Sequence, residues 1–160
     1  MKKFFLLAAA FVTGIAAMAQ TKADEVVKVD VEQYNFGKLK QNVPVTVYFT
    51  LTNTSDKPVV VENAWAGCGC TTPEVSKEPL APHASTKVKV GYNAAAMGTF
   101  TKDVYVKLVG IQDPKVIKIT GEVVDEANFN TYTKTADYKK AEKARLATFP
   151  KDAKSDKKSK

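Results

Sequence analysis

The sequence has few of the residues on which most enzymes and disulfide-rich domains are built. Two cysteines and one histidine occur among its 160 residues, which excludes a small domain held by several disulfide bonds. No glycine-rich phosphate-binding loop and no serine-nucleophile motif is present, and acidic residues occur singly rather than as a catalytic pair. We therefore expect a protein that is not an enzyme and that carries no cofactor.

The remaining composition is that of one folded domain with a basic end. Hydrophobic residues make up 44% of the chain and charged residues 26%, with a net charge of +7, which is a globular composition. Residues 134–160 contain ten basic and four acidic residues, whereas residues 4–133 contain twelve and thirteen. We interpret residues 127–160 as a basic, partly helical or disordered tail. Because the excess charge lies there and not on a recognition element, we expect no nucleic-acid binding.

The first nineteen residues have the pattern of a signal peptide. Two lysines precede an apolar run over residues 4–17, and Ala17 and Ala19 form the small-x-small pattern that places cleavage before Gln20. The run is shorter than the roughly 20 residues that cross a bilayer. We predict an exported protein, periplasmic or extracellular, with no transmembrane span in the mature chain.

Most of residues 27–123 alternate between apolar and polar side chains, as strands with one buried face do. The clearest run is residues 43–52, and the others are residues 27–31, 59–61, 86–92, 103–108 and 117–123, with another short strand near 78–80. Turn-forming residues separate them, at Phe36-Gly37, residues 53–58, Ala81-Pro82-His83, Met97-Gly98 and Gln112-Asp113-Pro114. No strong amphipathic helix interrupts the series, which argues against a parallel sheet with crossover helices.

These strands predict an all-β fold, an immunoglobulin-like antiparallel β-sandwich of about seven strands in a domain over residues 20–126. Trp65 is expected to be a core aromatic, because a tryptophan buries a large area. The residues that follow permit a short helix over 136–148, stopped by Pro150. Its apolar stripe is thin, so the helix is expected to dock weakly or to remain solvated.

Four short motifs in this order resemble a known family. They are Tyr34-Asn35-Phe36-Gly37, residues 49–54, Cys68-Gly69-Cys70-Thr71 and Thr120-Gly121-Glu122-Val123. Together they are similar to DUF1573, a family common among exported bacterial proteins and related to the ASH/Hydin-type β-sandwich domains. The resemblance covers residues 33–124 and departs at Pro82-His83, where the family usually has Pro-Gly. The family has no established activity, so the resemblance implies a noncatalytic binding or assembly module.

The Cys68-Gly69-Cys70 sequence is the one constellation that suggests chemistry. Side chains two residues apart on a strand face the same side, but their Cα atoms lie at or beyond the upper limit for a disulfide. A bridge would therefore require Gly69 to fold the chain into a turn, and it would close so small a loop that it could hardly stabilise the fold.

Three interpretations of this motif are open. The first is a structural turn with partly buried sulfurs beside Trp65. The second is thiol exchange with another exported protein or with an oxidant. The third is a Cu(I) site in which Cys68 and Cys70 are joined by His83 or Met97; by itself His83 is expected to be a turn residue. Zinc fits less well, because a structural zinc needs four ligands.

Two function hypotheses follow. The leading one is an exported noncatalytic interaction or assembly module of the bacterial cell envelope. It would bind an envelope protein or an anionic polymer through sheet edges or end loops. The alternative is a thiol-redox or copper-handling envelope protein that uses Cys68 and Cys70.

Overall fold

A computed structural model describes residues 21–150. The predicted signal peptide over residues 1–19, with its cleavage residues Ala17, Ala19 and Gln20, lies outside the described residues, as do residues 151–160 of the predicted tail. Within the described range, no helix is long and apolar enough to cross a membrane.

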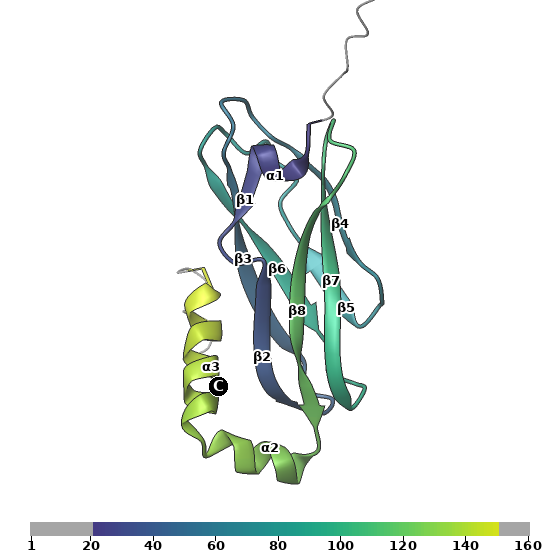
Figure 1. Cartoon of the computed structure of the whole chain (residues 1–160), viewed down its shortest axis with the longest axis vertical. Coiled ribbons are helices and arrows are strands. Elements are labelled where there is room, and N and C mark those ends of the chain that lie inside the picture. The colour runs from purple at the N-terminus through teal and green to yellow at the C-terminus, as the bar shows by residue number, and fades with distance from the viewer. Residues whose placement is uncertain (1–20, 151–160) are drawn as a thin grey trace, which may run out of the picture.

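Eight strands form two four-stranded sheets that pack face to face (Figure 1). In chain order they are β1 (Val27–Val29), β2 (Gln33–Lys40), β3 (Val45–Asn53), β4 (Val61–Ala66), β5 (Thr71–Glu74), β6 (Ser85–Tyr92), β7 (Gly98–Leu108) and β8 (Lys115–Val124). Sheet A has the order β1-β3-β6-β5, and sheet B has the order β2-β8-β7-β4. The predicted all-β sandwich is confirmed.

The alternating side chains form the core as predicted. In β3 the residues Val47, Phe49 and Leu51 are completely buried, and inward residues of β6, β7 and β8 such as Val88, Val104 and Ile119 are buried to the same extent. Facing rows from the two sheets thereby remove a continuous apolar surface from water, which supplies most of the free energy that stabilises the fold.

One strand differs from the sequence-based expectation. The turn predicted at Phe36-Gly37 is wrong, because both residues lie inside β2. Gly37 has a φ of +69° at a register shift between Asn35 and Lys38, and the side-chain oxygen of Asn35 accepts a hydrogen bond from the Gly37 amide at 2.8 Å. This bulge breaks the apolar alternation that would have marked a strand. β2 pairs in parallel with β8, so the sandwich is not purely antiparallel and has eight strands instead of about seven.

The segment between β3 and β6 also differs. The predicted strands at residues 59–61 and 78–80 are reduced to a single bridge between Val59 and Leu80, and β4 begins at Val61. β5 was missed, because Thr71–Glu74 is short and carries a proline. Its location beside β6, at the edge of sheet A, is the place where a strand tolerates proline.

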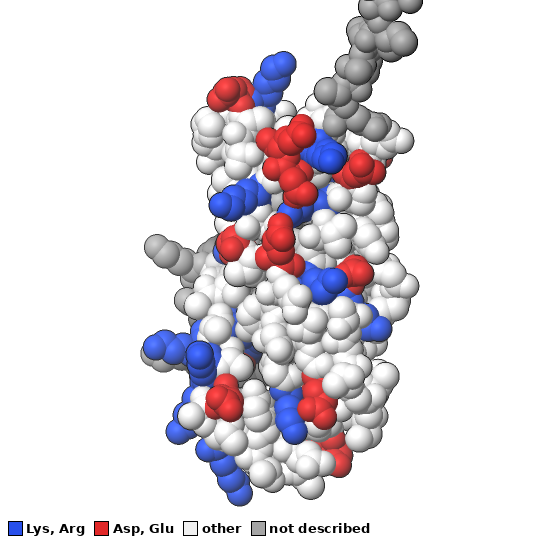
Figure 2. Space-filling view, viewed as in Figure 1, with Lys and Arg blue, Asp and Glu red and all other residues white. Residues whose placement is uncertain are grey.

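Two helices follow the sandwich. The helix predicted over residues 136–148 is confirmed as α3 (Ala136–Thr148), whereas α2 (Glu126–Thr133) was missed. The side chain of Asp125 caps α2 by accepting a hydrogen bond from the Asn128 amide. α3 lies alongside the sandwich against β2 and β3 (Figure 1), and Figure 2 shows Lys and Arg side chains gathered over it.

A nearly buried lysine ties the N-terminal helix α1 (Ala23–Val26) to sheet B. The side chain of Lys115 is 6% exposed, and its ammonium donates hydrogen bonds to Asp24 at 2.5 Å and to Glu32 at 2.6 Å. Burial acts to lower the pKa of Lys115, but the hydrogen bonds to both carboxylates outweigh it, and the pKa lies above its usual value. Lys115 therefore keeps its charge at the start of β8.

The same Val→Ala substitution, made once on the inner face and once on the outer face of sheet B, tests which face is buried. Val106→Ala in β7 removes a side chain that is 1% exposed, whereas Val116→Ala in β8 removes one that is 42% exposed. We expect the first to lower the free energy of unfolding by about 2 kcal/mol, from lost burial and a cavity. The second should change it by less than about 0.5 kcal/mol. Urea denaturation followed by circular dichroism measures both, and equal effects would contradict the assignment of the two faces.

Candidate functional site

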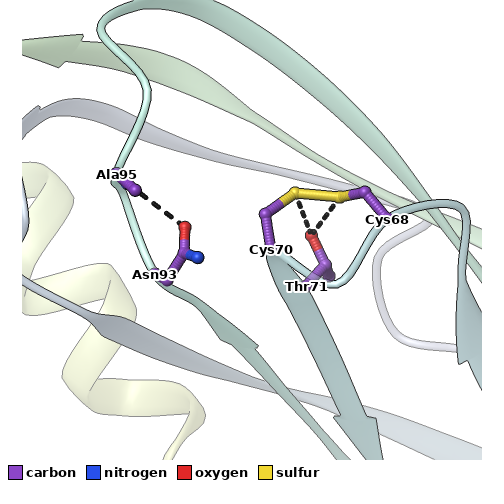
Figure 3. The surroundings of a disulfide bond; sticks show 5 residues. All are labelled: Cys68, Cys70, Thr71, Asn93 and Ala95. Carbon is purple, nitrogen blue, oxygen red and sulfur yellow. Dashed lines mark hydrogen bonds between the residues drawn. A yellow bond between two sulfur atoms is a disulfide. The ribbon is translucent and has the colours of Figure 1, made fainter.

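The two cysteines lie in the connection between β4 and β5 and form a disulfide bond (Figure 3). The chain turns at Gly69, where the Thr71 amide donates a hydrogen bond to the Cys68 carbonyl oxygen at 3.3 Å. This turn brings the two Cα atoms to 5.3 Å, inside the range for a disulfide. The sequence predicted that a disulfide would require a turn at Gly69, and the structure has that turn.

The disulfide is half-buried, and the Thr71 side chain contacts both of its sulfur atoms. The hydroxyl oxygen of Thr71 lies 3.8 Å from the Cys68 sulfur and 3.7 Å from the Cys70 sulfur. The Cys70 carbonyl oxygen accepts a hydrogen bond from the Asn93 amide at 3.0 Å, and Asn93 in turn accepts one from the Ala95 amide. Figure 3 shows the Thr71 and Ala95 contacts, and the Asn93–Cys70 hydrogen bond joins the loop to the end of β6.

The structure does not bring His83 to the cysteines. His83 lies in the turn before β6 with a φ of +59°, and its Nε2 atom is 3.4 Å from a carboxylate oxygen of Asp56. The cysteines lie at the far end of β6, whose eight residues span roughly 23 Å. Among the described residues, no three His, Cys, Asp or Glu side chains are grouped to hold a metal. The proposed Cu(I) ligand set of Cys68, Cys70 and His83 therefore does not assemble, and the two sulfurs are bonded to each other.

Trp65 is on the outside of the sandwich, so the prediction that it is a core aromatic is wrong. It is 39% exposed, whereas its neighbours Ala64 and Ala66 face the core. Its ring stacks on that of Tyr105, with centroids 5.4 Å apart and an interplanar angle of 18°. Tyr105 is in turn the register partner of Val116 in β8. We call Trp65, Tyr105 and Val116 the aromatic row.

The aromatic row continues into the disulfide loop. Charged residues flank it on the same face, including Asp103 and Lys118, which form an ion pair at 3.4 Å. A recess of about 240 Å³ lies at the row's end. Its lining residues come from the loop and from β7 and are Gly67, Cys68, Thr101, Lys102, Asp103 and Tyr105. An exposed apolar row, a recess and a disulfide thus form one continuous surface.

The fold defines the class of protein. Two packed four-stranded sheets, with a chain that crosses from β1 in sheet A to β2 in sheet B, are features of an immunoglobulin-like β-sandwich module. The chain belongs to DUF1573, a family described as protein of unknown function, whose model matches residues 27–123. That range contains all four motifs on which the resemblance was based, and the match confirms the predicted family.

Three solved structures are similar to part of this chain at low sequence identity. A protein of unknown function from Porphyromonas gingivalis W83 is 13% identical with a TM-score of 0.53, over 61% of this chain and 46% of that chain. The VesB protease of Vibrio cholerae is 17% identical with a TM-score of 0.53, over 63% and 33%. An ASH/PapD-like domain of human CEP192 is 11% identical with a TM-score of 0.49, over 76% and 98%.

This chain spans less than half of the P. gingivalis and V. cholerae structures. At these identities the likeness shows the fold alone, and the protease activity in one of the names belongs to that protein. Among curated proteins, none matches this chain.

The disulfide is expected to contribute little to stability. Cys68 and Cys70 are two residues apart, and so small a loop restricts the unfolded chain by only about 1.5 kcal/mol. A Cys68→Ser/Cys70→Ser variant should therefore fold, with a free energy of unfolding lower by that amount or less. Urea denaturation of the variant and of the reduced natural chain should agree, and a loss above about 4 kcal/mol would identify a structural crosslink instead.

Proposed function

We propose that this protein is an exported, noncatalytic interaction or assembly module of the bacterial cell envelope, and that the aromatic row is its contact with a partner protein. The observation that carries the proposal is the exposure of Trp65 and Val116, at 39% and 42%, in register across three strands. The outward positions of a solvated sheet are normally polar. A contiguous apolar row there favours a surface that is covered by a partner.

The composition of the surface favours a protein as that partner. Trp and Tyr side chains are enriched at protein interfaces, because each has an apolar body and a polar tip. The Asp103–Lys118 ion pair and Lys107 border the row, as a polar rim borders the apolar centre of an interface. The stacked Trp65 and Tyr105 rings would form the centre, where most of the binding free energy concentrates.

Export and the envelope location rest on two supports. The first is the signal-peptide pattern that ends at Ala19. The second is the bonded state of Cys68 and Cys70, since disulfides persist in compartments that are more oxidising than the cytoplasm.

A basic surface provides a weaker, second attraction. Lys139, Lys140 and Lys143 are exposed on α3, on the side where Figure 2 shows basic side chains gathered, and the sequence adds five lysines over residues 151–160. Such a surface would attract anionic envelope polymers in a salt-dependent way.

A photo-crosslinking residue placed at Val116 tests the aromatic row in intact cells. We expect one defined protein adduct. Trp65→Ala in the same chain should reduce the yield of this adduct at least tenfold, because a central aromatic residue of an interface typically contributes about 2 kcal/mol to binding. Val109 is the matched control, because it is a valine that is 58% exposed in the loop after β7. An adduct from position 109 and none from 116 would move the contact to the end loops and contradict this assignment.

A second candidate function is thiol-disulfide exchange at Cys68 and Cys70. The observation that favours it is the half-buried disulfide beside an open recess that Lys102 also lines. A thiolate of a dithiol partner would attack the Cys68 sulfur and displace Cys70 as a thiolate, which the Thr71 hydroxyl is close enough to stabilise. The partner's second thiolate would then release Cys68. The disulfide gains two electrons and two protons, and the partner dithiol becomes a disulfide.

Cys70→Ser tests the exchange in the reverse direction. The thiolate of its unpaired Cys68 attacks the disulfide of the oxidised partner and displaces one partner thiolate, and the mixed disulfide persists because residue 70 carries no thiol to resolve it. We expect a protein adduct from the cell envelope that disappears on reduction. Thr71→Val should slow the reduction of the disulfide by a small dithiol about threefold, because the displaced Cys70 thiolate loses a hydrogen-bond donor. A Cys70→Ser chain that remains a free monomeric thiol in the envelope would exclude this function.

A further inference from the structure

Helix α3 covers part of a sheet edge that none of the strands within residues 21–150 reaches. On one side β3 pairs with β6 over residues 45–52, but on the other side β1 pairs with residues 51–53 only. The Asp30 amide extends this ladder by donating a hydrogen bond to the Thr50 carbonyl oxygen at 3.1 Å. After that residue the chain crosses to sheet B as β2. The remaining part of the β3 edge, residues 45–49, lies beside α3.

Side chains of α3 occupy hydrogen-bonding positions of that edge. The Tyr48 amide donates to the Thr148 hydroxyl oxygen at 3.1 Å, and the Arg145 guanidinium donates to the Thr46 carbonyl oxygen at 3.2 Å. Residues 46 and 48 alternate with those bonded to β6, so their backbone groups face outward from the sheet. Side chains of the helix therefore make hydrogen bonds to outward backbone groups of β3 that the backbone of an added strand would otherwise make.

The docking of α3 is loose compared with the core. No residue of this helix is buried, and the Arg145 side chain on its inner face is paired with Glu142 of the same helix. A cavity of about 440 Å³ lies between the helix and the sandwich. Apolar residues of β2, β3 and α2 contribute to its lining, among them Phe36, Leu39, Val45 and Phe129. An element with few buried apolar contacts opens at a lower free-energy cost than the core does.

We propose that the edge of β3 at Thr46 and Tyr48 binds an extended segment of a partner protein, which adds to sheet A in line with β1 when α3 moves aside. The backbone of the segment replaces the hydrogen bonds made by Thr148 and Arg145. Every second side chain packs against the apolar part of the cavity lining that belongs to the sandwich, which includes Phe36, Leu39 and Val45, so the segment carries apolar residues with a period of two. This inference rests on the proposed function, because it names a second contact and the partner chemistry of the same module.

Coverage by α3 also limits the affinity. A guest strand binds only the fraction of molecules in which the edge is open, so any substitution that loosens α3 raises the apparent affinity in proportion. Thr148→Val removes the acceptor of the Tyr48 amide while keeping the branched shape of the side chain. Thr131→Val is its matched control, because the hydroxyl of this exposed threonine bonds a carbonyl of its own helix α2.

The probe is a synthetic, dye-labelled peptide that copies residues 25–32 of this chain, in which Val27, Val29 and Val31 alternate with charged residues. A peptide of the same composition with its valines adjacent is the negative control. Fluorescence polarisation with the full mature chain should show about fivefold tighter binding to Thr148→Val than to the natural chain or Thr131→Val, the fold-change expected when one hydrogen bond to the helix is lost.

Thr46→Pro should abolish peptide binding, because it removes an outward amide without touching the β6 ladder, and proline is tolerated on such an edge. Hydrogen exchange gives a readout independent of the probe, with faster exchange at the Tyr48 amide in Thr148→Val only. If Thr46→Pro does not fold, the comparison of Thr148→Val with Thr131→Val decides by itself.

Equal binding to Thr148→Val and Thr131→Val, equal binding of the control peptide, or binding that survives a folded Thr46→Pro would each overturn the proposal. Dimerisation of Thr148→Val without peptide, measured by sedimentation, would make a second copy of this chain the occupant and would also overturn it. A failed crosslink at Val116 leaves these measurements unaffected, because the aromatic row belongs to sheet B and the tested edge to sheet A.

Discussion

The crossover from sheet A to sheet B at Asp30 determines much of the rest of the structure. The Asp30 carboxylate accepts hydrogen bonds from the amide and the hydroxyl of Thr50 at 3.0 and 2.8 Å, and the Glu32 carbonyl oxygen accepts one from the Lys118 amide at 2.8 Å. Within two residues the chain thus leaves β3 and joins β8. Because it does not reverse direction there, β2 runs parallel to β8, and the edge of β3 is left for α3 to cover.

The residues shared with DUF1573 outside the cysteine motif have structural roles. The buried amide nitrogen of Asn53 lies within hydrogen-bond distance of three carbonyl oxygens, those of Lys57, Leu80 and Ala81, and so holds the long connection after β3. A Cβ at Gly121 would lie 2.9 Å from the Gly37 carbonyl oxygen, closer than side chains pack. These motifs identify the family because they maintain turns, bulges and close strand contacts, which explains why they reveal a fold and not an activity.

The two proposed binding surfaces lie on different sheets and differ in chemistry. The aromatic row and the disulfide loop share Tyr105 and Cys68 across one recess on sheet B, so binding there and exchange at the sulfurs would influence each other. The edge of β3 belongs to sheet A and offers backbone hydrogen bonds beside a covered cavity. A module with both kinds of surface can contact a folded partner with one sheet and an extended segment with the other.

By itself the sequence determined the sandwich, the family and the bounds of α3, because alternation, turn residues and helix propensity are local properties of the chain. The tertiary structure decided what depends on pairing between distant residues. Trp65 faces outward because the register of β4 against β7 places Ala64 and Ala66 inside. Cys68 and Cys70 join because a local turn at Gly69 replaces the extended geometry assumed for them. The covered edge of β3 exists only because residues 100 positions later fold back onto it, and no periodicity in the sequence records such a contact.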